Sequence, residues 1–316
     1  MIIVTAIPAQ FLYSCANTPL WYHLRGLTLN SELLAKYEYY SSLAHHVDDT
    51  INVIRGLTDA NMRDLDFIQH TLIPRLGLNN EILEEQPPEL SDYFGTGLHI
   101  WQYPSQLARY LQWLTNHAKD ITSYCEIGCR WGGMFILIKE WVQRAGAKLE
   151  YATAIDPIEE TPFLSRYKLL SEVPIEYIQG FSTEPRVEEI FRSRKPSFVF
   201  IDGDHSMKGV VHDHLLARDF ATIIVHHDVT SSACPDTTNF WSHVKQVESD
   251  FNSFEFCDQY ESVPMSYLGI GVLERRSKDV PLNTFIFSPE INESLKQRDP
   301  ESVARRLARK IKSLIR

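Results

Sequence analysis

Apolar and polar residues alternate along this chain with two different periods. From residue 98 to residue 275, short apolar runs are separated by longer segments in which apolar residues recur every three or four positions. Short apolar runs are typical of buried strands, and the longer period is typical of helices. This alternation predicts a mostly parallel sheet with helices on both faces, a doubly wound α/β fold. Seven strands are expected, at residues 123–127, 151–155, 175–178, 197–201, 222–226, 254–257 and 268–273.

Residues 1–97 show helical spacing without a sheet pattern. Apolar residues recur at helix spacing over 33–44 and 58–76, and the second of these segments contains Pro74 and ends before Gly77. The acidic, proline-containing stretch 84–92 is interpreted as a linker. We therefore expect a helical N-terminal segment at 1–97, serving as a lid or in dimerisation, ahead of an α/β domain at 98–275.

Residues 276–316 are expected to form a C-terminal extension that ends in a basic amphipathic helix. Val303 and Leu307 belong to its apolar stripe, whereas Arg305 and Arg309 belong to its basic face. Such helices can bind anionic membranes or partners. Packing on its own domain or on a second subunit is favoured here, because a single helix is a weak anchor for an acidic protein.

The composition is that of a soluble globular protein. The chain has 316 residues, of which 44% are hydrophobic and 23% are charged, and it contains no apolar run of the length that a membrane span requires. Its first residues are apolar, but they lack a basic start and include Pro8, so a signal peptide is not expected. A cytoplasmic location is the resulting expectation.

The net charge indicates the class of partner, and the spacing of the cysteines indicates the redox state of their thiols. The formal charge of −10 would repel nucleic acids and anionic membranes, which favours a small-molecule substrate. The five cysteines are scattered and include no C-x-x-C pair, which indicates reduced thiols. A homo-oligomer is compatible with these observations.

The stretch SYCEIGCRWGGMF, residues 123–135, predicts a strand, a glycine turn and a helix. Such turns bring backbone N–H groups and a helix N-terminus close to a ligand. The spacing of Gly128, Gly132 and Gly133 differs from the G-x-G-x-x-G of dinucleotide-binding proteins. Glu126 also precedes the first glycine, where it would repel a pyrophosphate and favour a ligand with cationic groups. An ordinary tight turn with a surface glutamate is the alternative.

Polar residues follow the next two predicted strands. Asp156 ends the strand after the glycine turn, at a position where a carboxylate can accept hydrogen bonds from both hydroxyls of a ribose. Ligands of doubly wound sheets bind at the carboxyl ends of the strands, which supports a nucleoside ligand here. Ser182, two residues beyond Gly180, is a weaker candidate, because it could equally be the N-cap of the following helix.

Carboxylate and imidazole groups follow two further strands, in IDGDHS and IIVHHDV. If these strands are neighbours, Asp202, His227 and Asp228 form a candidate divalent-metal site, with magnesium expected from the oxygen ligands and manganese, iron or zinc tolerated by imidazole. His205, three residues beyond Asp202, is a candidate general base for a substrate hydroxyl. Alternatively these acids and histidines only pair with one another, and His226 is more simply a buried core residue.

The pattern E-x-G-x-x-x-G resembles the first motif of class I S-adenosylmethionine-dependent methyltransferases. Together with IWQYPSQLARYL, IDGDHS and IIVHHDV, it resembles the cephalosporin-hydroxylase-type and macrolide-sugar O-methyltransferase branch, over residues 98–274. The resemblance implies seven strands with the last one inserted antiparallel. It also implies a cofactor pocket and a magnesium ion, with Asp202 as a ligand and His205 as the base. The implied cofactor-binding residues are Glu126, Gly128, Gly132, Asp156, Ser182 and Asp202.

One motif departs from that branch. His227–Asp228 stands where the macrolide-sugar enzymes have two adjacent acids, which leaves Asp228 as a ligand and puts the identity of the metal in question. Trp131, Tyr103 and the loop 230–239 are the candidates for the wall of a substrate site.

The combined expectation is an S-adenosylmethionine-dependent, divalent-metal-assisted O-methyltransferase that acts on a hydroxyl of a small molecule, such as a sugar or a secondary metabolite. A metal-independent methyltransferase with an oxygen or nitrogen acceptor is the nearest alternative. A non-catalytic module that binds the cofactor or a partner is a second alternative. A nicotinamide-dependent dehydrogenase is disfavoured by the glycine spacing.

Overall fold

The computed structural model describes residues 31–44, 46–277 and 281–296. Its centre is one seven-stranded sheet with the strand order β3-β2-β1-β4-β5-β7-β6. Strands β1 to β5 run parallel to one another. The strands are β1 (Ser123–Ile127), β2 (Tyr151–Asp156), β3 (Ile175–Gln179), β4 (Phe198–Ile201), β5 (Ile223–His227), β6 (Phe251–Phe256) and β7 (Ile270–Arg275).

The sheet is mixed and therefore not strictly doubly wound. Strand β7 pairs antiparallel with β5 on one side and with β6 on the other. The prediction of seven strands in a mostly parallel sheet is confirmed, and the last strand is inserted antiparallel. Strand β6 begins at Phe251, three residues before the predicted strand.

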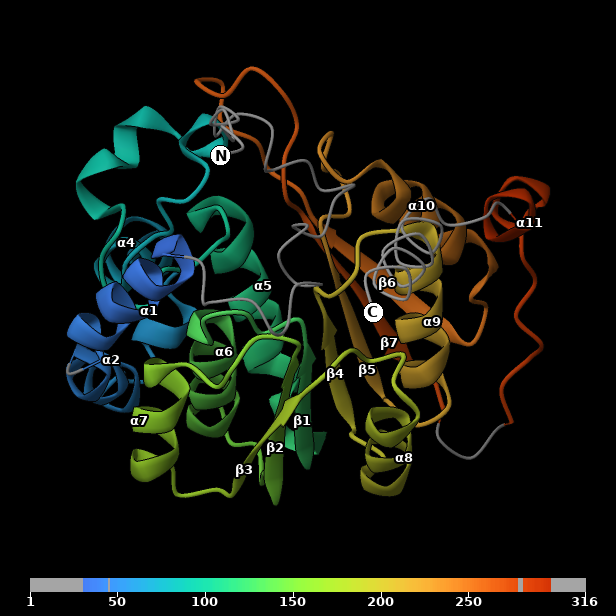
Figure 1. Cartoon of the computed structure of the whole chain (residues 1–316), viewed down its shortest axis with the longest axis horizontal. Coiled ribbons are helices and arrows are strands. Elements are labelled where there is room, and N and C mark those ends of the chain that lie inside the picture. Colours follow the sequence, from blue (N-terminus) through green and yellow to red (C-terminus); the bar gives the residue numbers. More distant parts are fainter. Residues whose placement is uncertain (1–30, 45, 278–280, 297–316) are drawn as a thin grey trace, which may run out of the picture.

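Helices cover both faces of the sheet (Figure 1). One hydrophobic core lies between the sheet and the helices α5 (Pro104–His117), α6 (Gly133–Arg144) and α7 (Pro162–Leu170). Tyr124 of β1 and Phe198 of β4 belong to this core. Helices α8 (Pro185–Arg194), α9 (Met207–Arg218) and α10 (Pro235–Val247) share a second core with Ile127 and Ile201. Successive strand residues point to opposite faces, so each strand contributes to both cores.

Residues 31–100 form a helical layer outside α6 and α7. Helices α1 (Ser31–Leu43) and α2 (His46–Arg55) contact α7 and α6, as Figure 1 shows at the left of the sheet. The predicted helix at 58–76 is broken into η3 (Asn61–Arg63), α3 (Leu65–Phe67), the π-helical turn η4 (Ile68–Leu72) and α4 (Ile73–Leu76). The side chain of Asp64 caps α3, which explains one of these breaks.

The stretch 84–92, which was interpreted as a linker, packs against the domain through residues 85–87, and most of its other residues are exposed. It consists mainly of the 3₁₀ turns η5 (Leu83–Glu85) and η6 (Pro88–Tyr93). The side chains of Glu85 and Gln86 are almost fully buried. The Tyr103 hydroxyl donates a hydrogen bond to the Glu85 carbonyl oxygen, which ties this stretch to the start of α5.

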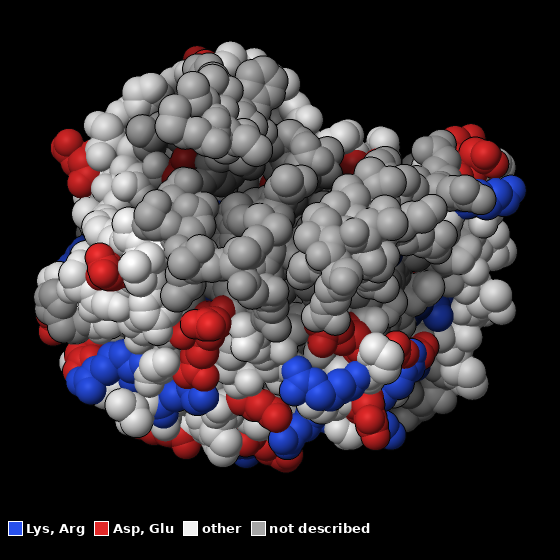
Figure 2. Space-filling view, in the orientation of Figure 1, with Lys and Arg blue, Asp and Glu red and all other residues white. Residues whose placement is uncertain are grey.

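The remaining described elements are η7 (Ala118–Asp120) and α11 (Pro289–Lys296). The predicted basic amphipathic helix near residues 303–316 lies outside the described residues. Within the part of the chain that is described, no helix is long and apolar enough to cross a membrane. Acidic and basic side chains are intermingled along the lower edge of the face shown in Figure 2.

Candidate functional site

Four neighbouring strands end in the predicted site residues. Ile127 of β1 is in register with Ile155 of β2 and Ile201 of β4, and Ile201 is in register with His226 of β5. The next residue of each strand therefore belongs to one row across the sheet, on the face covered by α5 and α6. That row is Asp156, Gly128, Asp202 and His227.

The glycine turn requires glycine for two different reasons. Gly128 has φ +86°, and a Cβ there would lie 1.9 Å from the carbonyl oxygen of Asp202, so the β1 and β4 ends could not approach. Gly132 has φ +92° at the N-cap of α6, and its Cβ would meet the side chain of Leu164 on α7. The turn thus combines left-handed backbone with close packing on both sides.

Asp156 is oriented by the backbone of that turn. Its Oδ2 accepts a hydrogen bond from the Arg130 N–H at 2.7 Å, and its Oδ1 accepts one from the Ile158 N–H at 3.0 Å. Burial raises the pKa of its carboxyl, although these two hydrogen bonds oppose the shift. Each oxygen keeps a further lone pair, so the predicted contact with ribose hydroxyls remains a prediction that the geometry permits.

Glu126 lies on the same face of β1 as Tyr124, whose hydroxyl donates a hydrogen bond to Glu126 Oε2. Only 2% of the Glu126 surface is exposed. Burial is the main reason why the pKa of this carboxyl is raised to about 8, and the nearby Asp202 charge adds to the shift. A buried acid of this kind gains most from a ligand that carries positive charge.

Ser182 lies on the other face of the sheet. Its hydroxyl lies near the completely buried carboxylate of Asp213 on α9, where it opposes the rise that burial causes in the pKa of that carboxyl. The N-cap of α8 is Glu184, whose side chain makes no capping hydrogen bond, so Ser182 is not the N-cap that the sequence left open. A contact between Ser182 and an adenine remains a prediction.

Two carboxylates and two imidazoles converge at the ends of β4 and β5. His205 Nε2 lies 3.1 Å from Asp202 Oδ1 and 3.4 Å from Asp228 Oδ2. His227 Nδ1 lies 3.2 Å from the same Asp202 oxygen and 3.4 Å from the same Asp228 oxygen. The structure therefore brings together the predicted base and the three predicted metal ligands, which we call the Asp–His cluster.

Asp228 reaches this cluster through an unusual backbone conformation. Consecutive strand residues normally point to opposite faces, so His227 and Asp228 would be separated. Asp228 has φ +59°, in the left-handed region that aspartate tolerates better than most residues. This local turn brings both side chains to the same point, as is common at functional sites.

A chain of glutamines fixes the proton on the outer nitrogen of His227. The backbone N–H of Gly269 can only donate, so it faces the amide oxygen Oε1 of Gln106. The backbone carbonyl of Asp258 can only accept, so it faces the amide nitrogen Nε2 of Gln106. Gln102 Nε2 then donates to Gln106 Oε1, so Gln102 Oε1 faces His227 Nε2. His227 Nε2 must therefore carry a proton.

The inner nitrogen of His227 faces only carboxylates. The imidazole is 4% exposed, and among the described residues Nδ1 finds no hydrogen-bond partner in acceptable geometry, despite its two carboxylate neighbours. Burial opposes a charge on this ring, but Asp202 and Asp228 outweigh it and raise the pKa of His227 well above the ordinary value. The cluster therefore attracts positive charge, which a proton on Nδ1 can supply.

Cys234 lies on the far side of the cluster. Its Sγ is 3.5 Å from His205 Nδ1 and donates to Asp228 Oδ2 at 3.4 Å. Both outer imidazole nitrogens of the cluster therefore have partners, Gln102 for His227 and Cys234 for His205.

His226 points away from the cluster, as the simpler interpretation of the sequence suggested. Its Nε2 lies 3.1 Å from Nδ1 of His214 on α9, among residues of the second core. Burial lowers its pKa well below the ordinary value for histidine, so this imidazole is neutral. It therefore has no part in the candidate site.

Residues 31–100 contact the glycine turn through Glu81. Its carboxylate accepts hydrogen bonds from the side chains of Arg130 and Trp131, the latter at 2.6 Å, and from Lys36 of α1 at 3.2 Å. Burial opposes ionisation of Glu81, but the positive charges of Arg130 and Lys36, together with the hydrogen bonds from Arg130 and Trp131, hold its pKa at about 2. Trp131 stacks on Tyr40 of α1 with ring centroids 4.1 Å apart. Trp131 thus packs inside the protein, and its place in a substrate wall stays a prediction.

Several of these contacts could not be read from the sequence. Gln106 lies in the first turn of α5 and Gln102 lies just before that helix, so their spacing of four residues left no helix-face signal. Cys234 lies in a loop that was considered only as a wall, and Tyr103 of the same wall proposal is fully buried. Glu81 carried no signal, because its partners Arg130 and Trp131 lie 49 and 50 positions away.

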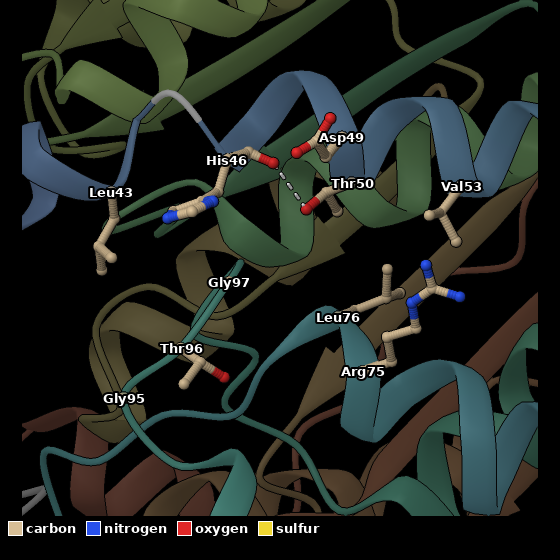
Figure 3. A pocket seen from close by; sticks show the side chains of 10 residues that line it. All are labelled: Leu43, His46, Asp49, Thr50, Val53, Arg75, Leu76, Gly95, Thr96 and Gly97. Atoms are coloured by element: carbon tan, nitrogen blue, oxygen red, sulfur yellow. Dashed lines mark hydrogen bonds between the residues drawn. The ribbon is translucent and has the colours of Figure 1, made fainter.

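A cavity of about 400 Å³ lies elsewhere, between α2, α4 and the loop 95–97 (Figure 3). Its lining mixes apolar side chains with His46, Asp49 and Arg75. The cavity does not include any residue of the strand ends. We assign the candidate site to the strand ends, where the reactive side chains converge.

Comparisons with known proteins identify no family. No family model matches the chain, and no curated protein matches it. Solved structures that match include cofactor-bound Rv0187 from MTB, with 14% identity over 54% of this chain and 81% of that chain, at a TM-score of 0.42. A SAM-dependent methyltransferase from Agrobacterium tumefaciens matches with 12% identity over 56% of this chain, at a TM-score of 0.34. This chain spans 64% of that protein.

A third structure, from Listeria monocytogenes and provisionally assigned as a class I S-adenosylmethionine-dependent methyltransferase, matches with 10% identity. The match covers 82% of this chain and 97% of that chain, at a TM-score of 0.34. Because the TM-scores are below 0.5, these matches carry no argument about the site. They also offer nothing in favour of the narrower branch that the sequence motifs resemble.

Proposed function

We propose that this protein is an S-adenosylmethionine-dependent methyltransferase that transfers a methyl group to a hydroxyl of a small molecule with the help of a divalent cation. The observation that carries this proposal is the row of strand ends. A glycine turn lies between two carboxylates, Asp156 and Asp202, and the Asp–His cluster adjoins it. The inserted antiparallel strand β7 agrees with the fold that the resemblance implies.

The cofactor end of the proposed site is formed by Glu126, Asp156 and the turn itself. Asp156 is held by two backbone N–H groups and can accept hydrogen bonds from ribose hydroxyls through its remaining lone pairs. Glu126 is a buried acid beside the turn, which favours the sulfonium and ammonium charges of the cofactor over a pyrophosphate. Gly128 and Gly132 keep the backbone close to the ligand.

The donor set fits a divalent cation. Asp202, His227 and Asp228 lie within reach of one ion, and His227 Nδ1 is a buried nitrogen with no hydrogen bond to any residue that the structure describes. When bound, the cation would hold the acceptor hydroxyl and lower its pKa. The chain's own task is to keep these side chains oriented, which Gln102 does for His227.

The proton of the acceptor must leave as the methyl group is transferred. The acceptor oxygen forms a bond to the methyl carbon while the bond from that carbon to sulfur breaks, giving a neutral thioether and one proton. His205, at the mouth of the cluster and 23% exposed, is the proposed base. Its Nε2 also faces both carboxylates, so a ligand role would compete with a base role.

Residues 1–97 are proposed to act as a lid or in dimerisation. Glu81 and Tyr40 of this segment contact the glycine turn directly. The acidic net charge of −10 supports a small-molecule substrate over a nucleic acid.

Product formation with a panel of acceptors tests this function. The full chain would be incubated with S-adenosylmethionine and a set of hydroxylated sugars and phenols, and S-adenosylhomocysteine would be quantified with magnesium, manganese or zinc and after chelation. We expect acceptor-dependent product that is lost after chelation and in Asp156→Asn. Activity that survives chelation would replace the metal-assisted route with a metal-independent one. Absence of cofactor binding would contradict the methyltransferase proposal itself.

A further inference from the structure

The Asp–His cluster has one more donor than the three ligands predicted from the sequence. His205 Nε2 is as close to the two carboxylates as His227 Nδ1 is. The four donor atoms form a closed ring in which carboxylate and imidazole alternate. Its four edges measure 3.1, 3.4, 3.4 and 3.2 Å.

The donor atoms favour one class of metal. Ligand atoms about 2.0–2.1 Å from a tetrahedral zinc ion are about 3.3–3.4 Å apart, and the edges of the ring are compatible with that spacing. Two of the four donors are nitrogens, which suit zinc rather than magnesium.

In each imidazole of the cluster, the nitrogen that points away from the carboxylates has a partner of its own, which leaves the other nitrogen able to act as a metal ligand. The glutamine chain places a proton on His227 Nε2, so Nδ1 can offer its lone pair toward Asp202 and Asp228. His205 Nδ1 faces Cys234 Sγ, and the thiol in turn donates to Asp228, which suits a proton on Nδ1 and a lone pair on Nε2. Four lone pairs that converge in this way require positive charge among them, supplied by a proton or by a metal ion that displaces it.

The charge of the cluster agrees with a metal ion. Two carboxylates carry a charge of −2, which one divalent cation neutralises when both imidazoles are neutral. Outer partners that orient ligating histidines are typical of metal centres, and Gln102 and Cys234 occupy those positions here.

We propose that Asp202, His205, His227 and Asp228 form a four-ligand centre for a transition metal of the zinc class, with His205 bound through Nε2. This inference refines the metal part of the proposed function and rests on it. In the cation-bound protein, His205 is then a ligand and not a free base. The centre selects its ion by nitrogen ligands, in contrast to the oxygen ligands of a magnesium site.

Metal binding without cofactor or acceptor tests the proposal directly. The metal-free full chain would be titrated with Zn²⁺ and, separately, with Mg²⁺ by calorimetry. We expect one equivalent of Zn²⁺ and at least about 100-fold weaker binding of Mg²⁺, because imidazole suits the former. Co²⁺ should give the strong visible absorption of a four-coordinate ion. Equal affinities for Zn²⁺ and Mg²⁺, or no Zn²⁺ binding, would overturn the proposal.

Variants separate the ligand role of His205 from a base role. His205→Asn should weaken Zn²⁺ binding about 100-fold or more, and Gln102→Leu, which removes the orienting contact with His227 and the hydrogen bond to Gln106, about 10–100-fold. His243→Asn, a histidine of α10 that bonds the Ile286 carbonyl, is the matched control and should bind as wild type does. Unchanged Zn²⁺ affinity in His205→Asn would place His205 outside the centre.

The outcome is independent of methyl transfer. Melting curves of the metal-free variants show whether each one is folded, so loss of affinity is not confused with loss of structure. A protein that binds Zn²⁺ as expected but does not bind S-adenosylmethionine would contradict the methyltransferase proposal and leave the metal centre standing. A protein that binds the cofactor but prefers Mg²⁺ would overturn the four-ligand zinc-class centre and leave the methyltransferase proposal standing.

Discussion

Glu126 is the side chain whose protonation reports most directly on the ligand of the glycine turn. Its pKa is raised to about 8, chiefly by burial, so the carboxyl is mostly protonated at pH 7 in the free protein. A ligand with positive charge stabilises the carboxylate form and lowers that pKa. Binding of such a ligand is therefore coupled to loss of a proton from Glu126.

We predict proton release when S-adenosylmethionine binds at pH 7. The release should decline as the pH rises through about 8, because Glu126 is then already ionised in the free protein. Calorimetry at pH 7 in buffers of different ionisation enthalpy measures the number of protons released. Glu126→Gln should remove the release, and equal proton release in this variant would show that another group is responsible.

The sequence predicted the residues whose positions follow from strand periodicity. Asp156, Asp202 and His227 each end an apolar strand, and parallel strands end at the same edge of a sheet. Gln102 and Cys234 could not be found in this way, because their roles depend on contacts with His227, 125 positions away, and with His205, 29 positions away. Such contacts are set by tertiary packing, which leaves little trace in local patterns.

The segment around Glu81 holds the turn between β1 and α6 from outside. The Arg130 side chain donates a hydrogen bond to Glu81, and the Arg130 N–H donates one to Asp156. Arg130 therefore links Glu81, in the outer helical layer, to the residue proposed to bind the cofactor ribose. Arg130 has φ +44°, an unfavourable conformation for arginine that this contact helps to maintain. Glu81 is thus a positioning residue for the proposed cofactor site.

We predict that Glu81→Gln weakens binding of S-adenosylmethionine about tenfold, since hydrogen bonds to charged groups contribute about 1.5–3 kcal/mol. Asp59→Asn is the matched control, because Asp59 pairs with Arg144 between the same layers but is exposed and distant from the turn. Calorimetric titration of both variants measures the effect. A loss of the same size in the control would indicate general loosening of the layer instead of positioning of the turn.

Elements with strong local patterns were predicted best. Strand β1 was predicted at its observed bounds, and β2 to β5 within one residue at either end, because short apolar runs flanked by polar residues leave few alternatives. The region 58–76 was predicted as one helix but contains a π-helical turn and several breaks. Helical spacing persists across such breaks, so periodicity alone does not reveal them.

The outer helical layer is joined to the α/β domain by a partly buried ion pair, in which the Glu140 carboxylate is buried. Arg55 of α2 donates to both oxygens of Glu140 on α6, at 2.8 and 3.0 Å. The Glu140 carboxylate also accepts a hydrogen bond from the Tyr167 hydroxyl and lies 3.3 Å from the ammonium of Lys139 on the same helix. Removal of Arg55 would leave a buried charge with fewer partners, so the pair couples the stability of the two layers.

We predict that Arg55→Met lowers the free energy of unfolding by about 1.5–3 kcal/mol, the usual contribution of a hydrogen bond to a charged group. Arg192→Met is the control, since Arg192 forms an exposed pair with Glu188 on α8 and should change stability by less than about 0.5 kcal/mol. Urea unfolding of both variants gives the comparison. Equal effects in the two variants would mean that burial of the Arg55 pair does not matter.

At the level of the whole molecule, the account depends on one ligand at one edge of the sheet. The glycine turn, Glu126 and Asp156 are proposed to bind S-adenosylmethionine, and the Asp–His cluster is proposed to act beside it. The most direct measurement is calorimetric titration of S-adenosylmethionine into the wild-type protein and into Asp156→Asn. We predict binding of one equivalent by the wild type and at least about tenfold weaker binding by the variant, which loses a charged acceptor. Absence of binding by the wild type, or equal binding by the variant, would contradict the assignment of this edge as a cofactor site.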